Sequence, residues 1–174
     1  MPDSTIVRPA TRDNIDGVRS IAHAYGNLGY WSRRPYYLDH EMESGRLLVA
    51  EDGGGGGMLV FVAVLELGGV AHLAELFVRP DRLGRGIGGR LLTEVMAGTE
   101  ERVTFASSDP RALPLYVRHG MRSVEPLLYL RGDRRAVGLL PVAGVSVEAA
   151  DPDDVLELDA RASGRGRSGD LTFL

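Results

Sequence analysis

The stretch "FVRPDRLGRGIGGRLL", residues 77–92, constrains the fold more than any other part of the chain. It links an apolar run to a second one in which Ile87, Leu91 and Val95 recur at helical spacing. Pro80 ends the first run, which reads as a strand. A glycine-rich turn from a strand into a helix presents successive backbone N–H groups, and such a turn binds anions. The sequence therefore predicts a strand, an anion-binding loop and a helix in this order.

The segments around this loop show strand-like and helix-like patterns. Apolar runs predict strands at residues 5–10, 46–50, 58–67, 70–78, 102–107 and 125–130. Helical spacing and capping residues predict helices at residues 11–25, 35–45, 109–120 and from 87 onward. Gly68 and Gly69 fit a tight hairpin turn, so three consecutive strands form an antiparallel meander. The predicted order is β-α-α-β-β-β-α-β-α-β. The fold class is α/β (α+β), with a mixed, mostly antiparallel sheet flanked by helices.

The composition excludes several kinds of site. The 174 residues suffice for one domain with a real core, and 44% of them are apolar. A net charge of −4 argues against nucleic-acid binding, and the absence of Lys excludes a Schiff-base or P-loop lysine. With no Cys and four scattered His, neither disulfides nor a metal site are expected. No apolar run is long enough for a membrane span or a signal core, so we expect a cytoplasmic protein without membrane contact.

Gly84, Gly86 and Gly89 also spell G-x-G-x-x-G, the fingerprint of Rossmann dinucleotide-binding domains. In that fold the glycines follow a strand almost directly and lie within a parallel β-α-β unit. Here residues 79–83 intervene, and the preceding strand belongs to an antiparallel meander. That fingerprint also requires a strand that ends in an acidic residue about twenty residues later, and this sequence predicts no such strand there. The flanking sequence thus disfavours a Rossmann site.

The loop resembles instead the acyl-CoA loop of the GNAT superfamily of N-acetyltransferases. In that family an apolar strand ends in Val and is followed by Pro. After the Pro come Gln or Arg, two residues of any type, Gly, one residue of any type, and Gly or Ala. Gly86 and Gly88 match the last two positions, while Leu83 stands in place of Gln or Arg. Because backbone amides do the binding in such a loop, this departure costs little.

A second signature of the family lies downstream at the right separation. The family often has Asn, Ala, Tyr and Gly-Phe at a fixed spacing, and this chain matches it at Asp109, Ala112, Tyr116, Gly120 and Met121. Asp replaces Asn, and Met replaces Phe. The resemblance covers residues 4–131. The sequence also resembles the first half of bacterial tandem GNAT proteins.

The resemblance implies that acetyl-CoA, or another acyl-CoA, is the cosubstrate. Its pyrophosphate would lie on the glycine-rich loop, and its pantetheine arm would pair with the end of the preceding strand as a false strand. The residues expected to bind it are Leu76, Phe77, Val78, Leu83, Gly84, Arg85, Gly86, Ile87, Gly88, Gly89, Arg90, Asp109, Ala112 and Tyr116. Among the arginines of the loop, Arg85 is favoured because it lies inside the nest.

In GNAT enzymes an amine attacks the thioester directly, so the resemblance implies a base and an acid. Tyr116 is the candidate general acid, since a phenol keeps its proton at neutral pH and can pass it to a thiolate. For the base, His72 and Glu75 both remain candidates, and a water is a third. Strict alternation would place these two side chains on opposite faces of their strand, although a bulge would change this.

The loop "YGNLGYWSRRPYYLDH" is expected to border the acceptor site, as this region does in similar proteins. Its aromatic side chains suit an apolar or cationic acceptor, and its arginines suit a carboxylate. The candidate substrate residues are Tyr30, Trp31, Arg33 and Tyr36. The resemblance implies a small-molecule or protein amine as the acceptor. The alternative function is a non-catalytic acyl-CoA-binding sensor or scaffold module.

The last part of the chain repeats the first. "TIVRPATRDNIDGV" at Thr5 and "VSVEAADPDDVLEL" at Val145 share a strand pattern, a capping residue and a helix start, 140 residues apart. The sequence thus predicts an acyltransferase domain at 4–131, a linker at 132–142, and an incomplete second repeat at 143–174. An orphan strand–helix pair seeks a sheet edge, which would allow a homodimer.

Overall fold

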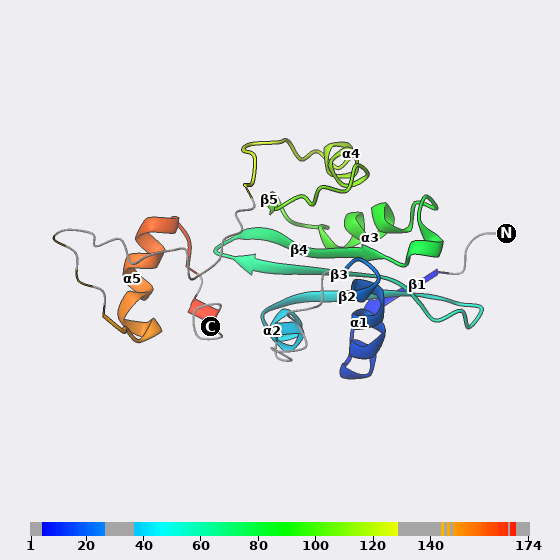
Figure 1. Cartoon of the computed structure of the whole chain (residues 1–174), viewed down its shortest axis with the longest axis horizontal. Coiled ribbons are helices and arrows are strands. Elements are labelled where there is room, and N and C mark those ends of the chain that lie inside the picture. The colour runs from blue at the N-terminus through cyan, green and yellow to red at the C-terminus, as the bar shows by residue number, and fades with distance from the viewer. Residues whose placement is uncertain are drawn as a thin grey trace, which may run out of the picture.

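A five-stranded sheet forms the centre of the molecule (Figure 1). The computed structural model describes residues 5–26, 37–128, 144, 146, 148–166 and 168–169. The strands lie side by side in chain order: β1 Thr5–Pro9, β2 Gly45–Asp52, β3 Met58–Leu67, β4 Val70–Val78 and β5 Glu101–Thr104. β1 to β4 are antiparallel neighbours, whereas β5 runs parallel to β4. The mixed, mostly antiparallel sheet expected from the sequence is confirmed.

Helices cover both faces of this sheet. α1 and α2 lie on one face, and α3 and α4 lie on the other (Figure 1). The bounds of the helices are α1 Ile15–His23, α2 Tyr37–Ser44, α3 Ile87–Val95, α4 Ala112–Arg118 and α5 Pro152–Ser163, with 3-10 turns η1 Arg12–Asn14 and η3 Pro80–Arg82. Since the side chains of a strand alternate, each face buries its own apolar cluster. Phe61 of β3 is fully buried on the α1–α2 face, and Leu73 of β4 is buried on the α3 face.

β4 departs from regular pairing at one residue. Ala63 of β3 pairs with Glu75, but the next residue of β3, Val64, pairs with Leu73. Ala74 is therefore the extra residue of a β-bulge. The parallel pairing of β4 with β5 ends at the same place, with Leu73 opposite Thr104. From residue 74 to residue 78 that edge of β4 has no strand partner among the described residues.

The bulge also resets which side chains share a face. Leu73 and Leu76 both pack in the cluster under α3, although they are three residues apart. Ala74 and Phe77 pack in the cluster under α1 and α2. His72 and Glu75 therefore lie on the same face, the one that α1 and α2 cover. Strict alternation would have separated them.

The last predicted strand is wrong over its described part. Residues 125–128 form no strand, and the rest of the predicted span, residues 129 and 130, lies outside the described residues. Pro126 has no N–H to donate to a ladder. Leu127 and Leu128 are 66% and 76% exposed, so they also lack the side-chain packing that stabilises a strand.

The C-terminal segment begins a helix where the repeat predicts one. The Asp151 side chain accepts a hydrogen bond from the Asp153 N–H at 3.0 Å, so it caps α5. After Gly164 the chain meets the β3–β4 turn: a Cβ added at Gly68 would lie 2.9 Å from the Cβ of Arg165. The division of the chain into domains and linker stays a prediction.

Candidate active site

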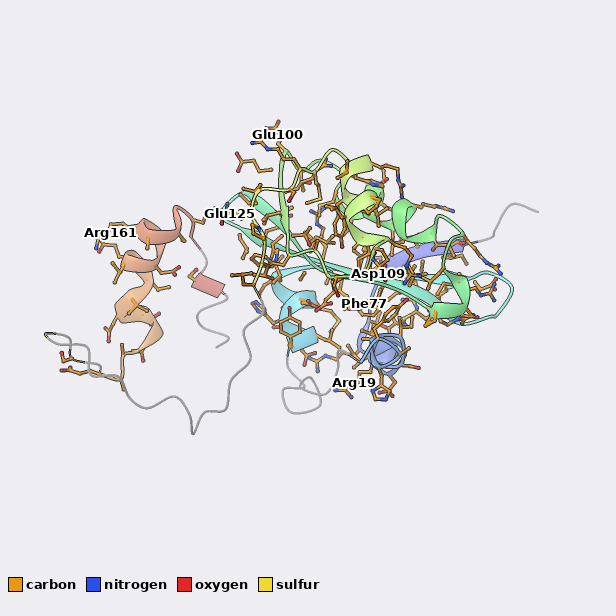
Figure 2. All side chains as sticks on the ribbon, turned by 45° about the horizontal axis from the view of Figure 1, so that its top comes forward. Arg19, Phe77, Glu100, Asp109, Glu125 and Arg161 are labelled. Atoms are coloured by element: carbon orange, nitrogen blue, oxygen red, sulfur yellow. The ribbon has the colours of Figure 1, made fainter. Side chains whose placement is uncertain are left out.

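A cleft of about 550 Å³ opens beside the unpaired edge of β4. Its walls are the end of β4, the glycine-rich loop leading into α3, and the segment from Ser107 through α4, with Tyr25 closing one side. Figure 2 labels two of its lining residues, Phe77 on β4 and Asp109 before α4. The lining includes every predicted cosubstrate residue except Arg90. It also includes residues that the sequence analysis did not single out: Tyr25, Ser107, Ser108, Pro110, Arg111, Leu115 and Arg118.

The backbone of β4 offers hydrogen bonds to this cleft. The Arg79 N–H donates to the Leu59 carbonyl of β3 at 2.7 Å. In an antiparallel ladder residues two apart bond in the same direction, so Phe77 also faces β3. The N–H and C=O groups of Leu76 and Val78 therefore point toward the cleft. An extended ligand that carries amides can pair with them as an added strand.

The glycine-rich loop has the backbone shape of an anion nest. Gly84 and Gly86 have φ angles of 77° and 78°, which favour glycine. Gly86 is the N-cap of α3, so the first N–H groups of that helix open into the cleft. A Cβ at Gly88 would lie 3.0 Å from a methyl group of Val78, which shows how closely α3 approaches β4. These N–H groups and the helix dipole favour a phosphate.

Of the four arginines of the loop, Arg82 and Arg85 line the cleft, whereas Arg79 and Arg90 do not. Arg79 donates to the Gly56 carbonyl at 2.9 Å and to Asp81 at 2.7 Å, so it ties the loop to the β2–β3 turn. Arg82 lines the cleft and lies 3.6 Å from Asp52. Arg85 lines the cleft as well, as the sequence favoured, while Arg90 does not.

Tyr116 of α4 faces the cleft from the side of the α3 cluster. Burial raises the pKa of its phenol, and the charges of Glu75 and Asp109 raise it further, while hydrogen bonding with Thr104 opposes them. Asp109 itself stays ionised, because hydrogen bonds from Arg111 lower its pKa to about 2. The phenol therefore keeps its proton at neutral pH.

The two predicted base candidates have different surroundings. Glu75 lies directly after the bulge, and burial raises its pKa to about 7. His72 lies in the paired part of β4, opposite Val103, with its ring 5.4 Å from the ring of Phe105. Neither residue lines the cleft itself. The charge of Glu75 nevertheless raises the pKa of Tyr116.

The predicted acceptor residues Tyr30, Trp31, Arg33 and Tyr36 lie outside the described residues. The sequence analysis missed two groups, one that lines the cleft and one that is buried under α2. Tyr25 follows α1 and donates to the Val78 carbonyl at 2.5 Å. Glu41 of α2 is fully buried. A tyrosine after a helix and an acid within one are ordinary in sequence, so no local pattern marked either.

Comparison with known proteins shows which family this arrangement resembles. The family model described as "Acetyltransferase (GNAT) domain" matches residues 43–122, which run from the end of α2 to just past α4 and contain the loop and the second signature. Over these residues the chain is similar to the acetyltransferases of the GNAT superfamily. A curated relative, the mycothiol acetyltransferase of Rhodococcus opacus strain B4, is 35% identical over 117 residues. That match covers 60% of this chain and 38% of the relative, so the chain spans about two fifths of the relative's length.

Solved structures share the fold of the chain. A Trypanosoma brucei acetyltransferase superposes with a TM-score of 0.60 and 14% identity, over 74% of this chain and 99% of that one. A Clostridium acetobutylicum acetyltransferase solved with acetyl-CoA superposes with a TM-score of 0.59 and 14% identity, over 73% of this chain and 96% of that one. The PaiA N-acetyltransferase of Thermoplasma acidophilum, solved with coenzyme A, superposes with a TM-score of 0.55 and 17% identity, over 67% of this chain and 88% of that one. At these identities the likeness establishes the GNAT fold.

No helix in the described part of the chain is long and apolar enough to cross a membrane. The described residues likewise contain no cluster of three or more His, Asp or Glu side chains that could hold a metal ion.

Proposed function

We propose that the chain is an acyl-CoA-dependent N-acetyltransferase that moves the acetyl group of acetyl-CoA to a primary amine by direct attack. The observation that carries this proposal is the unpaired edge of β4 beside an anion nest, in one cleft. The two features match the two ends of the cosubstrate, an amide-containing arm and a pyrophosphate. The relatives solved with acetyl-CoA and coenzyme A support the assignment.

The cleft would hold acetyl-CoA in an extended form. The pyrophosphate would accept hydrogen bonds from the N–H groups at Gly86 to Gly89, with Arg85 supplying charge. The pantetheine amides would pair with the outward backbone groups of Leu76 and Val78. A backbone N–H of β4 near the bulge would then donate to the thioester carbonyl and stabilise the oxyanion.

Two side chains would move the protons. Glu75, whose pKa is about 7, would accept a proton from the ammonium group, directly or through a water. The amine nitrogen attacks the thioester carbon, and the carbon–sulfur bond breaks as the tetrahedral intermediate collapses. Tyr116 would give its proton to the departing thiolate. His72 remains the second candidate base, although its place in the paired part of β4 favours it less than Glu75.

The acceptor would enter from the side of residues 27–36, where Tyr30, Trp31, Arg33 and Tyr36 are the proposed contacts. We also propose that a homodimer would give residues 143–174 a sheet edge to pack on.

Thermal unfolding with ligands tests the cosubstrate. Acetyl-CoA at millimolar concentration is expected to raise the melting temperature, because a ligand that binds only the folded state stabilises it. NAD is the matched control, since it carries a pyrophosphate but no pantetheine arm. A shift for NAD with none for acetyl-CoA would contradict the proposal and would favour a dinucleotide site.

A further inference from the structure

The imidazole ring of His119 links two helices that border the cleft. His119 is the C-cap residue of α4, and it is half-buried. Its Nδ1 lies 2.8 Å from the Leu115 carbonyl oxygen of α4, and its Nε2 lies 3.1 Å from the Gly89 carbonyl oxygen of α3. Nε2 also lies 3.2 Å from the hydroxyl of Thr93, one turn further along α3. The ring therefore spans the space from one helix to the other.

The contacts of the ring indicate where its protons lie. The Leu115 carbonyl can only accept a hydrogen bond, so Nδ1 carries a proton. In the neutral ring Nε2 is then an acceptor, and the Thr93 hydroxyl can donate to it. In the charged ring Nε2 donates to the Gly89 carbonyl instead. A hydrogen bond between the ring and α3 is therefore available in both protonation states.

Apart from this ring, few contacts hold α4 in place. None of its seven residues is buried, and Leu113 and Val117 are 50% and 54% exposed. Leu115 and Tyr116 pack partly in the apolar cluster under α3. Among the hydrogen bonds of the described residues, only those of His119 join α4 or its C-cap to another helix. α3, in contrast, has four buried residues: Ile87, Leu91, Leu92 and Val95. The position of α4 therefore depends on His119 more than the position of α3 does.

The two carbonyl groups that the ring connects belong to two walls of the cleft. α3 and α4 lie on the same face of the sheet (Figure 1). Gly89 lines the cleft beside the anion nest, and Leu115 lines it directly before Tyr116, the proposed acid. A Cβ added at Gly89 would lie 3.4 Å from the Leu115 Cδ1 and 3.6 Å from the His119 Cε1, so the helices approach closely here. His119 itself does not line the cleft.

We propose that His119 is a positioning residue that holds Tyr116 at a set distance from the anion nest. This inference rests on the proposed acetyl transfer. Acetyl-CoA carries its pyrophosphate and its thioester at the two ends of one arm, so an acid that serves the sulfur must keep its distance from the pyrophosphate site. A displacement of about 1 Å can cost a reaction roughly 10²-fold in rate, which is why a tie behind the acid matters.

His119→Asn and His119→Gln differ by one CH₂ group and test the reach of the side chain. The amide nitrogen of Asn can take the place of Nδ1 and donate to the Leu115 carbonyl, but it is too short to reach α3. The amide nitrogen of Gln can take the place of Nε2 and donate to the Gly89 carbonyl. The first variant therefore removes the tie between the helices, and the second keeps it.

Hydrogen exchange of the full chain tests the tie without any turnover. In His119→Asn the amides of α4 should exchange roughly 2- to 10-fold faster, the scale of one net hydrogen bond. The amides of residues 91–95 in α3 should exchange as in the wild type, and so should both helices in His119→Gln. Unchanged exchange of α4 in His119→Asn would overturn the tie, and so would equal losses in the two variants.

Kinetics test whether the tie acts through Tyr116. In His119→Asn kcat should fall roughly 10-fold or more. The Kd of acetyl-CoA should hold, because the nest stays on α3, and His119→Gln should keep a kcat near that of the wild type. Adding His119→Asn to Tyr116→Phe should cost nothing further, because the acid that His119 positions is already gone. Losses that multiply in the double variant would show that His119 acts independently of Tyr116 and would overturn the proposal.

These tests separate the role of His119 from the acetyl transfer. Turnover of amines with multiplying losses would leave the enzyme proposal standing and overturn the role of His119. Faster exchange of α4 in His119→Asn, with no turnover of any amine by the wild type, would support the tie between the helices and contradict the enzyme proposal.

Discussion

The hydroxyl of Tyr25, in the turn that follows α1, donates a hydrogen bond of 2.5 Å to the carbonyl oxygen of Val78 on the open edge of β4. The Tyr25 ring also packs on Phe77, with centroids 5.3 Å apart. The carbonyl held in this way is one of the groups that a pantetheine amide would need. The tyrosine thus fills a hydrogen-bonding position that the cosubstrate would take over.

Tyr25→Phe should therefore tighten the binding of CoA. The change keeps the ring and removes the competing donor, so CoA affinity should rise roughly 2- to 10-fold, the scale of one net hydrogen bond. Adenosine 3′,5′-diphosphate has no pantetheine arm and should bind both proteins equally. Calorimetry with the two ligands separates the effects. Weaker CoA binding in the variant would mean that the hydroxyl supports the ligand rather than competes with it.

Tyr116→Phe should separate the binding of acetyl-CoA from its reaction. Because the ground-state thioester needs no proton, affinity should hold, while kcat should fall roughly 10²-fold or more, the scale for losing a positioned acid. Stability should change by about 1 kcal/mol or less. Melting temperature, affinity and turnover are measured on one preparation of the variant and one of the wild type. Normal turnover would remove Tyr116 from the mechanism and leave solvent as the proton source.

Gly86 and Gly98 form a matched pair for testing the loop. Their φ angles are 78° and 77°, and an added Cβ would meet nothing within 4 Å at either place. Changing either residue to Ala should therefore cost similar stability, roughly 1–2 kcal/mol of backbone strain. Only Gly86 lines the cleft, so only Gly86→Ala should weaken acetyl-CoA binding. Equal loss of binding in both variants would show that the loop acts through stability alone.

Much of this loop could be predicted from the sequence, because its chemistry is local. Glycines at Gly84 and Gly86 permit positive φ, and the apolar spacing after them specifies a helix whichever fold surrounds it. The same holds for the hairpin at Gly68 and Gly69, both with positive φ. The predicted lining of the cleft followed from these motifs, and every predicted cosubstrate residue except Arg90 lies there.

What the sequence could not predict depends on tertiary contacts. The bulge at Ala74 has no marker in its own sequence, and it decides that Glu75 and His72 share a face. The burial of Glu41 depends on how α2 packs, and its helix pattern alone would tolerate an exposed acid there. The strand expected at 125–130 is the opposite case: an apolar run predicted a strand, but residues 125–128 pair with no strand of the sheet.

The stability of the protein should fall as the pH rises from about 5 to 8. Glu41 and Glu75 have folded-state pKa values of about 8 and about 7, above the ordinary 4.5, so the folded state binds more protons than the unfolded state in this range. The stability that they contribute is complete below pH 4.5 and is lost as the pH rises through the folded pKa values. Glu41→Leu should flatten this slope and be more stable than the wild type at pH 8.

Urea unfolding at several pH values measures the slope for both proteins. Glu43→Leu is the control, since Glu43 lies in the same helix, is exposed, and should leave the slope unchanged. Identical slopes in the wild type and Glu41→Leu would mean that the acid is ionised in the folded protein, and the linkage argument would be wrong.

The central claim is acetyl transfer to an amine, and a thiol-release assay measures it directly. The full chain is mixed with acetyl-CoA and a panel of primary alkylamines, amino acids and peptides with free amino groups, with Tyr116→Phe in parallel. We predict CoA thiol release that depends on a primary amine, with an equal amount of N-acetyl product, and its near loss in Tyr116→Phe. Detectable acetyl-CoA binding with no release on any amine would contradict the claim and leave a non-catalytic acyl-CoA-binding module.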